Sequence, residues 1–377
     1  MTIDDMATLF QDVGAALARI PALDAAVASL HAANEQAEVR ITDLLHTLTD
    51  TRSQLAAATA QLDALTAKRG TFEIDPAFDS ERSLWYGKLR EAIAAQRTSI
   101  LTTAATGSPE AVGFAVKDYV LALAWAIGGK PDPLLLAEMV DVFNALCRRT
   151  APGTPTAKDA AFLASLYALA AYLLHVNRHP DAAEWLDRAR AACANGVPQD
   201  DFMHPYAASA ETAAYLWLTT GEARWKDDLD LRVEELQRSI GFEADGRATW
   251  WHRPSFARGK PGDTPHPAVT YARYVIQSLA MLSRLGVDVV PMRALADTVR
   301  FLTSPPPPLC LYYWMDGGAY PDMRGAIQQH DPAKFASSNF AFVIGADASG
   351  ELARRFAANA SKTFIHVPAA FVGKADS

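Results

Sequence analysis

The chain has 377 residues, of which 50% are hydrophobic and 21% are charged, and its formal net charge is −8. This composition is that of a globular protein, and the acidic excess argues against nucleic acid or an anionic membrane surface as a partner. Three cysteines give no disulfide framework, and no CxxC or HExxH spacing indicates a metal site, so we expect no metal or other cofactor.

A heptad repeat is the first regular pattern and runs from Leu9 to Leu65. Apolar residues recur at alternating steps of four and three, and Asn34 occupies one of these positions. A period of about 3.5 residues predicts a left-handed coiled coil with partner helices. We expect residues 1–69 to be an oligomerisation stalk that pairs with itself through residues 9–65. A homotrimer is favoured over a homodimer because leucines beside the seam widen the apolar face.

Two features of the stalk have more than one interpretation. Pro21 either opens a second helix or kinks a continuous one. An intramolecular helical hairpin would also bury the apolar stripe, but a turn would normally reset the heptad, which is unbroken. The first residues carry acids rather than a basic start, and no apolar run reaches membrane-spanning length, so we expect neither a secretory leader nor membrane insertion.

Residues 70–79 predict a linker, and residues 80–377 predict a helical head. Prolines suited to a first helical turn recur along this head, 22 to 25 residues apart over its first half, at Pro109, Pro133, Pro155, Pro180, Pro205, Pro267 and Pro291. Further helices fit the segments Ser80–Thr103, Glu222–Ile240, Ala333–Ile344 and Gly350–Asn359. Strand-like patterns are confined to Leu309–Met315 and Thr363–Val372. We therefore predict an all-α protein with minor β structure.

One helical hairpin carries a resemblance to a known group of folds. The segment Pro205–Glu235 joins two amphipathic stretches through a small-residue turn at Thr220-Gly221. It resembles the hairpins of α/α toroid proteins, which include many polysaccharide lyases and glycoside hydrolases. The resemblance implies a ring of helical hairpins with a ligand cleft at one rim. Tetratricopeptide repeats are an alternative, but their period of about 34 residues does not fit the spacing here.

Aromatic residues outside the helices suggest a carbohydrate site. Trp250 and Trp251 lie in residues 241–263, a long interruption of the helical rhythm. Tyr312 and Trp314 lie in a second cluster, where Asp316 either faces a ligand or sets a turn before two glycines. Aromatic faces stack on apolar faces of sugar rings, although a tryptophan can equally belong to the core.

The candidate catalytic residues follow from the toroid resemblance. In toroid lyases, a histidine or tyrosine removes a proton beside a uronate carboxylate, which a cationic or amide side chain neutralises. Here the resemblance implies five candidates, with the arginine neutralising the carboxylate: His204, His252, His266, Tyr271 and Arg253. His204 and His266 precede helix-opening prolines, where a helix N-terminus favours the neutral imidazole. Each histidine can instead be a cap or loop residue.

A stalk joined to a globular head is the layout of fibre and spike proteins. The sequence therefore favours a structural protein of a phage virion, made in the host cytoplasm, whose head binds a cell-surface glycan or receptor and contacts other virion proteins. A polysaccharide lyase or depolymerase is the first alternative. A helical scaffold that binds proteins is the second.

Overall fold

The computed structural model describes residues 6, 8–31, 34, 36, 40, 76–128, 132–149, 154–260, 263, 269–303, 339–358 and 365–372. The chain divides into two compact units, Met1–Glu73 and Ile74–Ser377. A helix begins at Pro76, so residues 76–79 of the segment expected to be a linker are helical. Among the described residues, the only sheet is the pair β1 (Ile240–Phe242) and β2 (Ala248–Trp250). The described part of the chain is therefore all-α, as the sequence predicts.

The first unit contains a helix over Thr8–His31, which passes through Pro21 without interruption. Its apolar side chains are exposed at successive heptad positions, namely Leu9, Val13, Ile20, Leu23, Val27 and Leu30. The heptad positions after Arg40 lie outside the described residues.

The expectation that no apolar run reaches membrane-spanning length was wrong. Two described helices meet that criterion by length and composition, Thr8–His31 and α6 (Ala157–Val176). α6 is mostly buried inside the second unit, as core helices of soluble proteins are, and an N-terminal signal sequence passes the same test. The criterion by itself is weak evidence for a membrane span.

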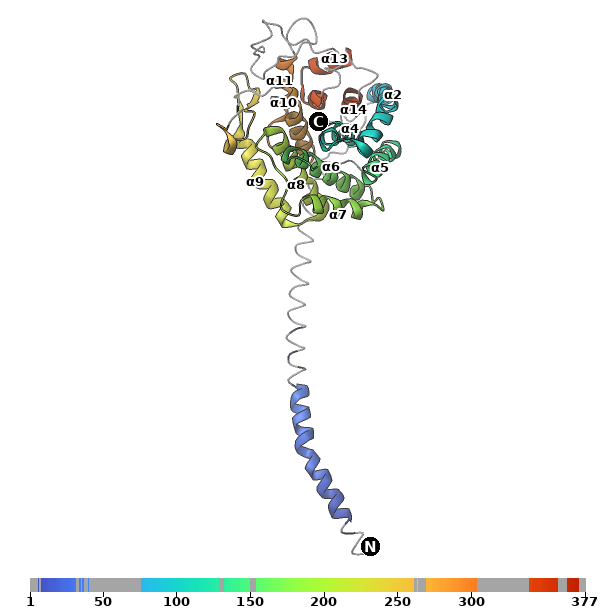
Figure 1. The fold of residues 1–377 in the computed structure, drawn as a ribbon, viewed down its shortest axis with the longest axis vertical. Helices are drawn as coiled ribbons and strands as arrows, with labels where there is room; N and C mark the ends of the chain where they lie inside the picture. Colours follow the sequence, from blue (N-terminus) through green and yellow to red (C-terminus); the bar gives the residue numbers. More distant parts are fainter. Residues whose placement is uncertain are drawn as a thin grey trace. The chain divides into compact units, whose positions relative to one another are not determined.

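The second unit alternates two sets of helices along the chain (Figure 1). The outer set comprises α2 (Pro76–Thr106), α5 (Pro133–Cys147), α7 (Ala182–Ala192), α9 (Ala223–Ser239), α11 (Met292–Leu302) and α13 (Glu351–Ala358). The inner set comprises α4 (Lys117–Ile127), α6, α8 (Met203–Thr220), α10 (Val269–Arg284), the 3₁₀ helix η3 (Asn339–Ala346) and α14 (His366–Val372). Short elements complete the unit: α3 (Pro109–Ala111), the π-helix η1 (Val112–Val116) and the 3₁₀ turn η2 (Ser255–Ala257).

Contacts among the inner elements form a closed circuit. They run from α4 to α6, α8, α10, η3 and α14, and α14 packs back against α4. Each outer helix packs on an inner element next to it in this order, and α2 packs on α14. Trp85 of α2 and Phe371 of α14 stack with ring centroids 4.0 Å apart, so the first and last helices of the unit meet.

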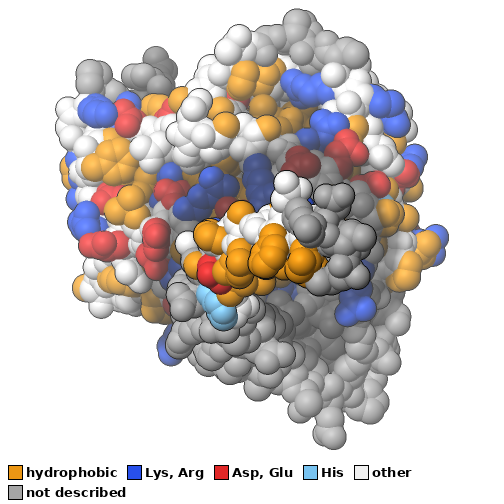
Figure 2. Space-filling model, turned by 90° about the horizontal axis from the view of Figure 1, so that it is seen from below, with side chains coloured by type: hydrophobic (Ala, Val, Ile, Leu, Met, Phe, Trp, Pro, Cys, Tyr) orange, Lys and Arg blue, Asp and Glu red, His pale blue; other side chains and the backbone are white. Residues whose placement is uncertain are grey.

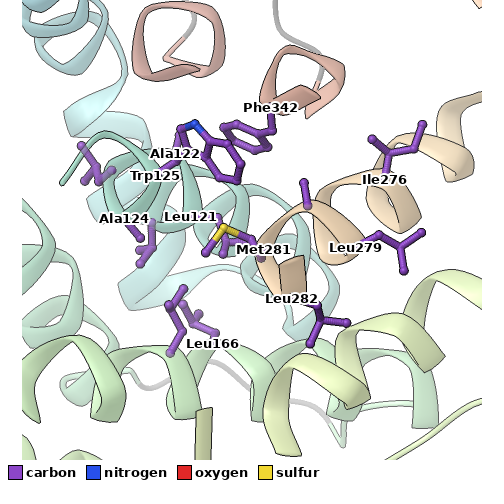
Figure 3. Close-up of a cluster of buried hydrophobic side chains, with 14 of the residues drawn as sticks. Leu121, Ala122, Ala124, Trp125, Leu166, Ile276, Leu279, Met281, Leu282 and Phe342 are labelled. Carbon is purple, nitrogen blue, oxygen red and sulfur yellow. The ribbon is translucent and has the colours of Figure 1, made fainter. Parts of the chain in front are cut away.

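Apolar side chains fill the space between the inner elements. Figure 3 shows Leu121 and Trp125 of α4, Leu279 and Met281 of α10, and Phe342 of η3 in one buried cluster. The Trp125 and Phe342 rings stack with centroids 4.8 Å apart. Every residue of α4 is buried. The sequence of this helix therefore lacks the alternation of apolar and polar positions that marks a helix with one side in water.

Proline positions locate the helix starts to within two residues. α3 and α5 begin at Pro109 and Pro133, behind the capping residues Ser108 and Asp132. The other starts lie one or two residues away; α6, for example, begins after a capping box at Thr156 rather than at Pro155. The hairpin of α8 and α9 turns at Gly221, which has a φ of 69° and is therefore in the left-handed region that glycine tolerates.

Two secondary-structure predictions were wrong. Residues 366–372, which alternate like a strand, form α14, because burial of the whole segment against α2 and α4 outweighs local β propensity. Residues 241–263 were expected to be irregular, but their first part forms the β1–β2 hairpin together with Ile240, which was expected to end a helix. The other strand-like segment, Leu309–Met315, lies outside the described residues.

Figure 2 shows one face of the molecule in space-filling form. Among the described residues on that face, acidic and basic side chains are interspersed with hydrophobic ones. A continuous basic surface, which nucleic-acid binding requires, is therefore lacking on the described part of that face.

Candidate functional site

The starts of the inner helices α4, α6, α8 and α10 meet at one place. Phe114, just before α4, lies 4.8 Å from Phe162 of α6 and 4.9 Å from Tyr274 of α10, measured between ring centroids. His204, the second residue of α8, lies 6.0 Å from Phe162 and 6.5 Å from Tyr274. Four helices that are distant in sequence therefore place aromatic rings against one another.

A glycine allows the closest of these approaches. A Cβ atom at Gly113 would lie 2.9 Å from the Cβ atom of Phe162, which is closer than such atoms tolerate. Gly113 and Phe114 both belong to the π-helix η1, and the Phe114 and Phe162 rings are tilted by 49° to each other. π-Helical turns are rare and occur frequently at functional sites.

Three of the predicted catalytic residues come together at this place, and we call them the histidine–tyrosine cluster: His204, His252 and Tyr271. The His204 ring stacks on Tyr271 with centroids 4.9 Å apart, and the His252 ring meets Tyr271 edge-on at 5.4 Å. The two imidazole centroids are 6.1 Å apart. His204 is only 2% exposed, whereas Tyr271 is 42% exposed, so the cluster runs from the core to the surface.

A backbone hydrogen bond holds His252 beside α8. The N–H of Met203, the first residue of α8, donates to the carbonyl oxygen of His252 at 2.9 Å. Phe202 then packs against the His252 ring at 4.8 Å. Arg253 turns toward Phe202, with its guanidinium carbon 4.2 Å from the ring centroid, and forms an ion pair with Asp201 at 3.8 Å. Arg253 is buried and supports the cluster from the side.

Burial lowers the pKa of both imidazoles of the cluster. It is the main cause that lowers the pKa of His204 well below its ordinary value, and the nearby His252 and Lys158 lower that pKa further. The pKa of His252 is lowered by burial and by Arg253, while Asp263 opposes the shift. The predicted direction for His204 is confirmed, but burial rather than the helix N-terminus is the main cause.

A buried ion pair lies next to the cluster. Lys117 Nζ is 2.7 Å from Glu211 Oε2, which also accepts a hydrogen bond of 2.7 Å from Ser165 Oγ. Lys117 Nζ lies 5.1 Å from the centroid of Phe162, the ring that contacts His204. All three polar groups are buried, so this network supports the site from within and does not face solvent.

The adjacent tryptophans have different environments. Trp250 is 1% exposed and pairs across the hairpin with the buried Ile240, so it belongs to the core. Trp251, the residue after β2, is 38% exposed and lines a groove of about 340 Å³ to which Trp250 also contributes. Trp250 lacks an exposed ring face for a sugar to stack on, and the sugar platform stays a prediction that rests on Trp251.

Four predicted site residues lie outside the described residues: His266, Tyr312, Trp314 and Asp316. Among the residues that the structure describes, no group of three or more histidine, cysteine, aspartate or glutamate side chains could hold a metal ion.

Sequence reasoning missed several residues that surround the cluster: Phe114, Lys158, Phe162, Phe202 and Arg273. Lys158 Nζ lies 5.2 Å from the Phe114 ring centroid, and Arg273 donates a hydrogen bond of 2.6 Å to the Tyr274 hydroxyl. Each missed residue lies near the start of an inner helix. Prolines lie within two residues of the starts of α6, α8 and α10, so the residues around these three starts could have been compared with one another.

Comparison of the chain with protein-family models, with curated proteins and with solved structures gave no match.

Proposed function

We propose that the chain is an oligomeric fibre- or spike-type protein of a phage virion. In this proposal the second unit is an α/α toroid that binds an acidic cell-surface polysaccharide. Support for the toroid comes from the closed circuit of contacts among the inner elements and from the alternation of inner and outer helices along the chain. In such a ring the parallel inner helices begin at one rim, and the histidine–tyrosine cluster lies where α8 and α10 begin.

The convergence of His252 and Tyr271 carries the proposal. One residue comes from the insertion after β2 and the other from the start of α10, yet their rings touch at the surface. An exposed tyrosine offers an aromatic face and a hydroxyl, and a neutral imidazole offers one donor and one acceptor. These are the groups that recognise a sugar ring, whose hydroxyls require hydrogen bonds and whose C–H faces require an apolar surface.

The exposed helix of the first unit supports self-association. Its apolar side chains follow the heptad from Leu9 to Leu30 and are exposed in the single chain. Several side chains this large do not remain in water along one stripe without a partner. A second and third copy of the same helix would bury them, which is the arrangement of a stalk.

A polysaccharide lyase is the second candidate, because burial lowers the pKa of both imidazoles and the His252 ring meets the exposed Tyr271. A neutral His252 could take the proton from the carbon beside a uronate carboxylate. The electron pair would then form a carbon–carbon double bond as the glycosidic oxygen leaves with a proton from a nearby acid. The role expected for Arg253 as the neutralising group is weakened by its ion pair with Asp201.

One set of measurements tests both candidates on the full chain. Binding of polygalacturonate, alginate and hyaluronan is measured by calorimetry, and absorbance of unsaturated sugar ends is followed at the same time. Tyr271→Ala should weaken binding about tenfold, the loss expected for a stacked aromatic. His175→Ala, an exposed histidine in the last turn of α6, is the matched control.

The outcomes separate the three interpretations. Binding without new absorbance supports a recognition head. An absorbance rise that His252→Ala abolishes makes the protein a depolymerase. If no polysaccharide binds, the glycan proposal fails and a protein-binding scaffold is the remaining interpretation.

A further inference from the structure

The groove beside Trp251 has a composition that the histidine–tyrosine cluster does not explain. We call it the hairpin groove, and it is lined by Arg238, Ser239, Ile240, Gly241, Glu243, Thr249, Trp250, Trp251 and Arg258. Its volume of about 340 Å³ is at the lower end of the range for small-molecule sites, roughly 300–1,000 Å³. The groove therefore suits one small unit of a ligand.

The strand register explains the shape of the groove. Gly241 pairs with Thr249 across the hairpin, and side chains two residues apart share a face, so Glu243 and Trp251 lie on the same face as this pair. Gly241 has no side chain, which leaves a hollow in the middle of the face. Trp251 stands at one end of the hollow and Glu243 at the other, where its N–H continues the ladder to Arg247.

A held cation lies at the tryptophan end. The guanidinium carbon of Arg258 is 5.2 Å from the Trp251 ring centroid, within the distance of a cation–π contact. Arg258 Nη2 donates a hydrogen bond of 3.1 Å to the carbonyl oxygen of Ser239. This partner is neutral, and among the described residues Arg258 forms no ion pair, so its charge is not cancelled there.

The other charges of the groove are arranged differently. Arg238 forms ion pairs with Glu234 and Glu235, which reduces its pull on a bound anion. The exposed carboxylate of Glu243 makes no hydrogen bond or ion pair with another described residue. The groove therefore presents a positive group at one end, a carboxylate at the other, and the Thr249 hydroxyl between them.

We propose that the hairpin groove binds one uronate residue of the polysaccharide, and this rests on the proposed function because the same chain would extend to the histidine–tyrosine cluster. The sugar ring stacks on Trp251 above Gly241, with its carboxylate at Arg258 and its hydroxyls at Thr249 and Glu243. Trp251 and His252 are consecutive residues of the same insertion, and in this proposal one oligosaccharide extends from the groove to the cluster.

The test compares sugars that differ by one carboxylate. Tetramers of galacturonate, mannuronate and glucuronate are titrated into the full chain beside tetramers of galactose, mannose and glucose. Trp251→Ala should weaken uronate binding about tenfold. Arg258→Gln should weaken binding of the uronates by a similar factor and leave any binding of the neutral tetramers within about twofold.

A groove-filling variant provides an independent check. A Cβ atom at Gly241 would meet only the Thr249 hydroxyl, at 3.9 Å, and its φ is not in the left-handed region. Gly241→Val should therefore keep the fold, as checked by circular dichroism, while blocking the hollow and weakening uronate binding about tenfold or more. Phe242→Ala removes a 58% exposed aromatic from the other face of the same strand and should leave binding unchanged.

The outcomes distinguish the two proposals. Uronate binding that responds to Tyr271→Ala but survives Gly241→Val and Trp251→Ala overturns the groove and leaves the proposed function standing. Equal affinity for uronate and neutral tetramers overturns the role of Arg258 and with it the uronate assignment. If no tetramer and no polysaccharide binds the unaltered chain, both proposals fail.

Discussion

The backbone N–H of Met203 donates a hydrogen bond of 2.9 Å to the carbonyl oxygen of His252. This bond joins the first residue of α8 to the insertion after β2, and it depends on no side chain. The main chain therefore fixes the place of residue 252 in the cluster. The side chain of His252 is not needed for this bond and is available for a functional role. Substitutions at His252 should consequently report on function more than on folding.

The buried histidines predict an acid-sensitive fold. Burial and Arg273 lower the pKa of His366 to about 3, and the pKa values of His204 and His252 are also lowered. Histidine in an unfolded chain has a pKa of about 6.5. Below that pH, these histidines bind protons in the unfolded chain but not in the folded chain. The free energy of unfolding should therefore fall as the pH drops below 6.5, by up to about 1.4 kcal/mol per pH unit for each such histidine.

Urea denaturation at pH 7.5 and pH 5 measures this dependence. Between pH 7.5 and pH 5, the free energy of unfolding should fall less for the His366→Gln variant than for the unaltered chain. This difference is independent of how stable the variant is at pH 7.5. The exposed His175, replaced by alanine, should retain the full difference. An unchanged difference in the His366 variant would show that this residue does not carry the effect.

The ion pair of Lys117 and Glu211 predicts strong coupling between the two residues. Lys117→Met leaves the Glu211 carboxylate buried without its cation, which should cost about 3–5 kcal/mol. The double variant with Glu211→Leu removes both charges and should recover most of that loss. Chemical denaturation of both single variants and the double variant gives the coupling energy. Additive losses would mean that the two side chains do not act as a pair.

The two tryptophans of the insertion should separate stability from binding. Trp250→Ala opens a cavity in the core and should cost about 3–5 kcal/mol. Trp251→Ala removes an exposed ring and should cost less than about 1 kcal/mol, while it weakens oligosaccharide binding. Thermal unfolding and calorimetry on the same samples decide this. The opposite order of stability losses would exchange the roles assigned to the two rings.

The heptad predicts that the first unit drives assembly. Light scattering should give a multiple of the chain mass for the full protein and a single chain for a protein that begins at Phe72. Asn34→Leu should raise thermal stability and broaden the distribution of oligomers, because a polar seam residue fixes strand number at a cost in stability. If both proteins have the same oligomeric state, the first unit does not drive assembly and the proposed stalk is wrong.

Local signals in the sequence predicted more of the fold than of the site. Prolines and capping residues such as Asp132 act within one turn, so they marked helix starts reliably. The β1–β2 hairpin also had such a signal, the Asp245-Gly246 turn, where Gly246 has a φ of 86°, and it was overlooked. Reading that turn would have assigned Trp250 and Trp251 to opposite faces.

Long-range packing decided what the sequence could not predict. α14 is helical because its neighbours bury it, and nothing within residues 363–372 indicates those neighbours. The stacking of His204 on Tyr271 likewise depends on the packing of α8 against α10. Residue types predicted which histidines could matter, and only the arrangement of helices brought two of them together.

The stacking of Trp85 on Phe371 has a consequence for synthesis on the ribosome. Phe371 follows Trp85 by about 290 residues, so at about 5–20 residues per second it emerges on the order of tens of seconds later. During this time the surface of α2 that α14 will cover is open to water and to other nascent chains. The apolar helix at Thr8–His31 emerges earlier still, so we expect neighbouring chains on one messenger to find each other through it before either head is complete.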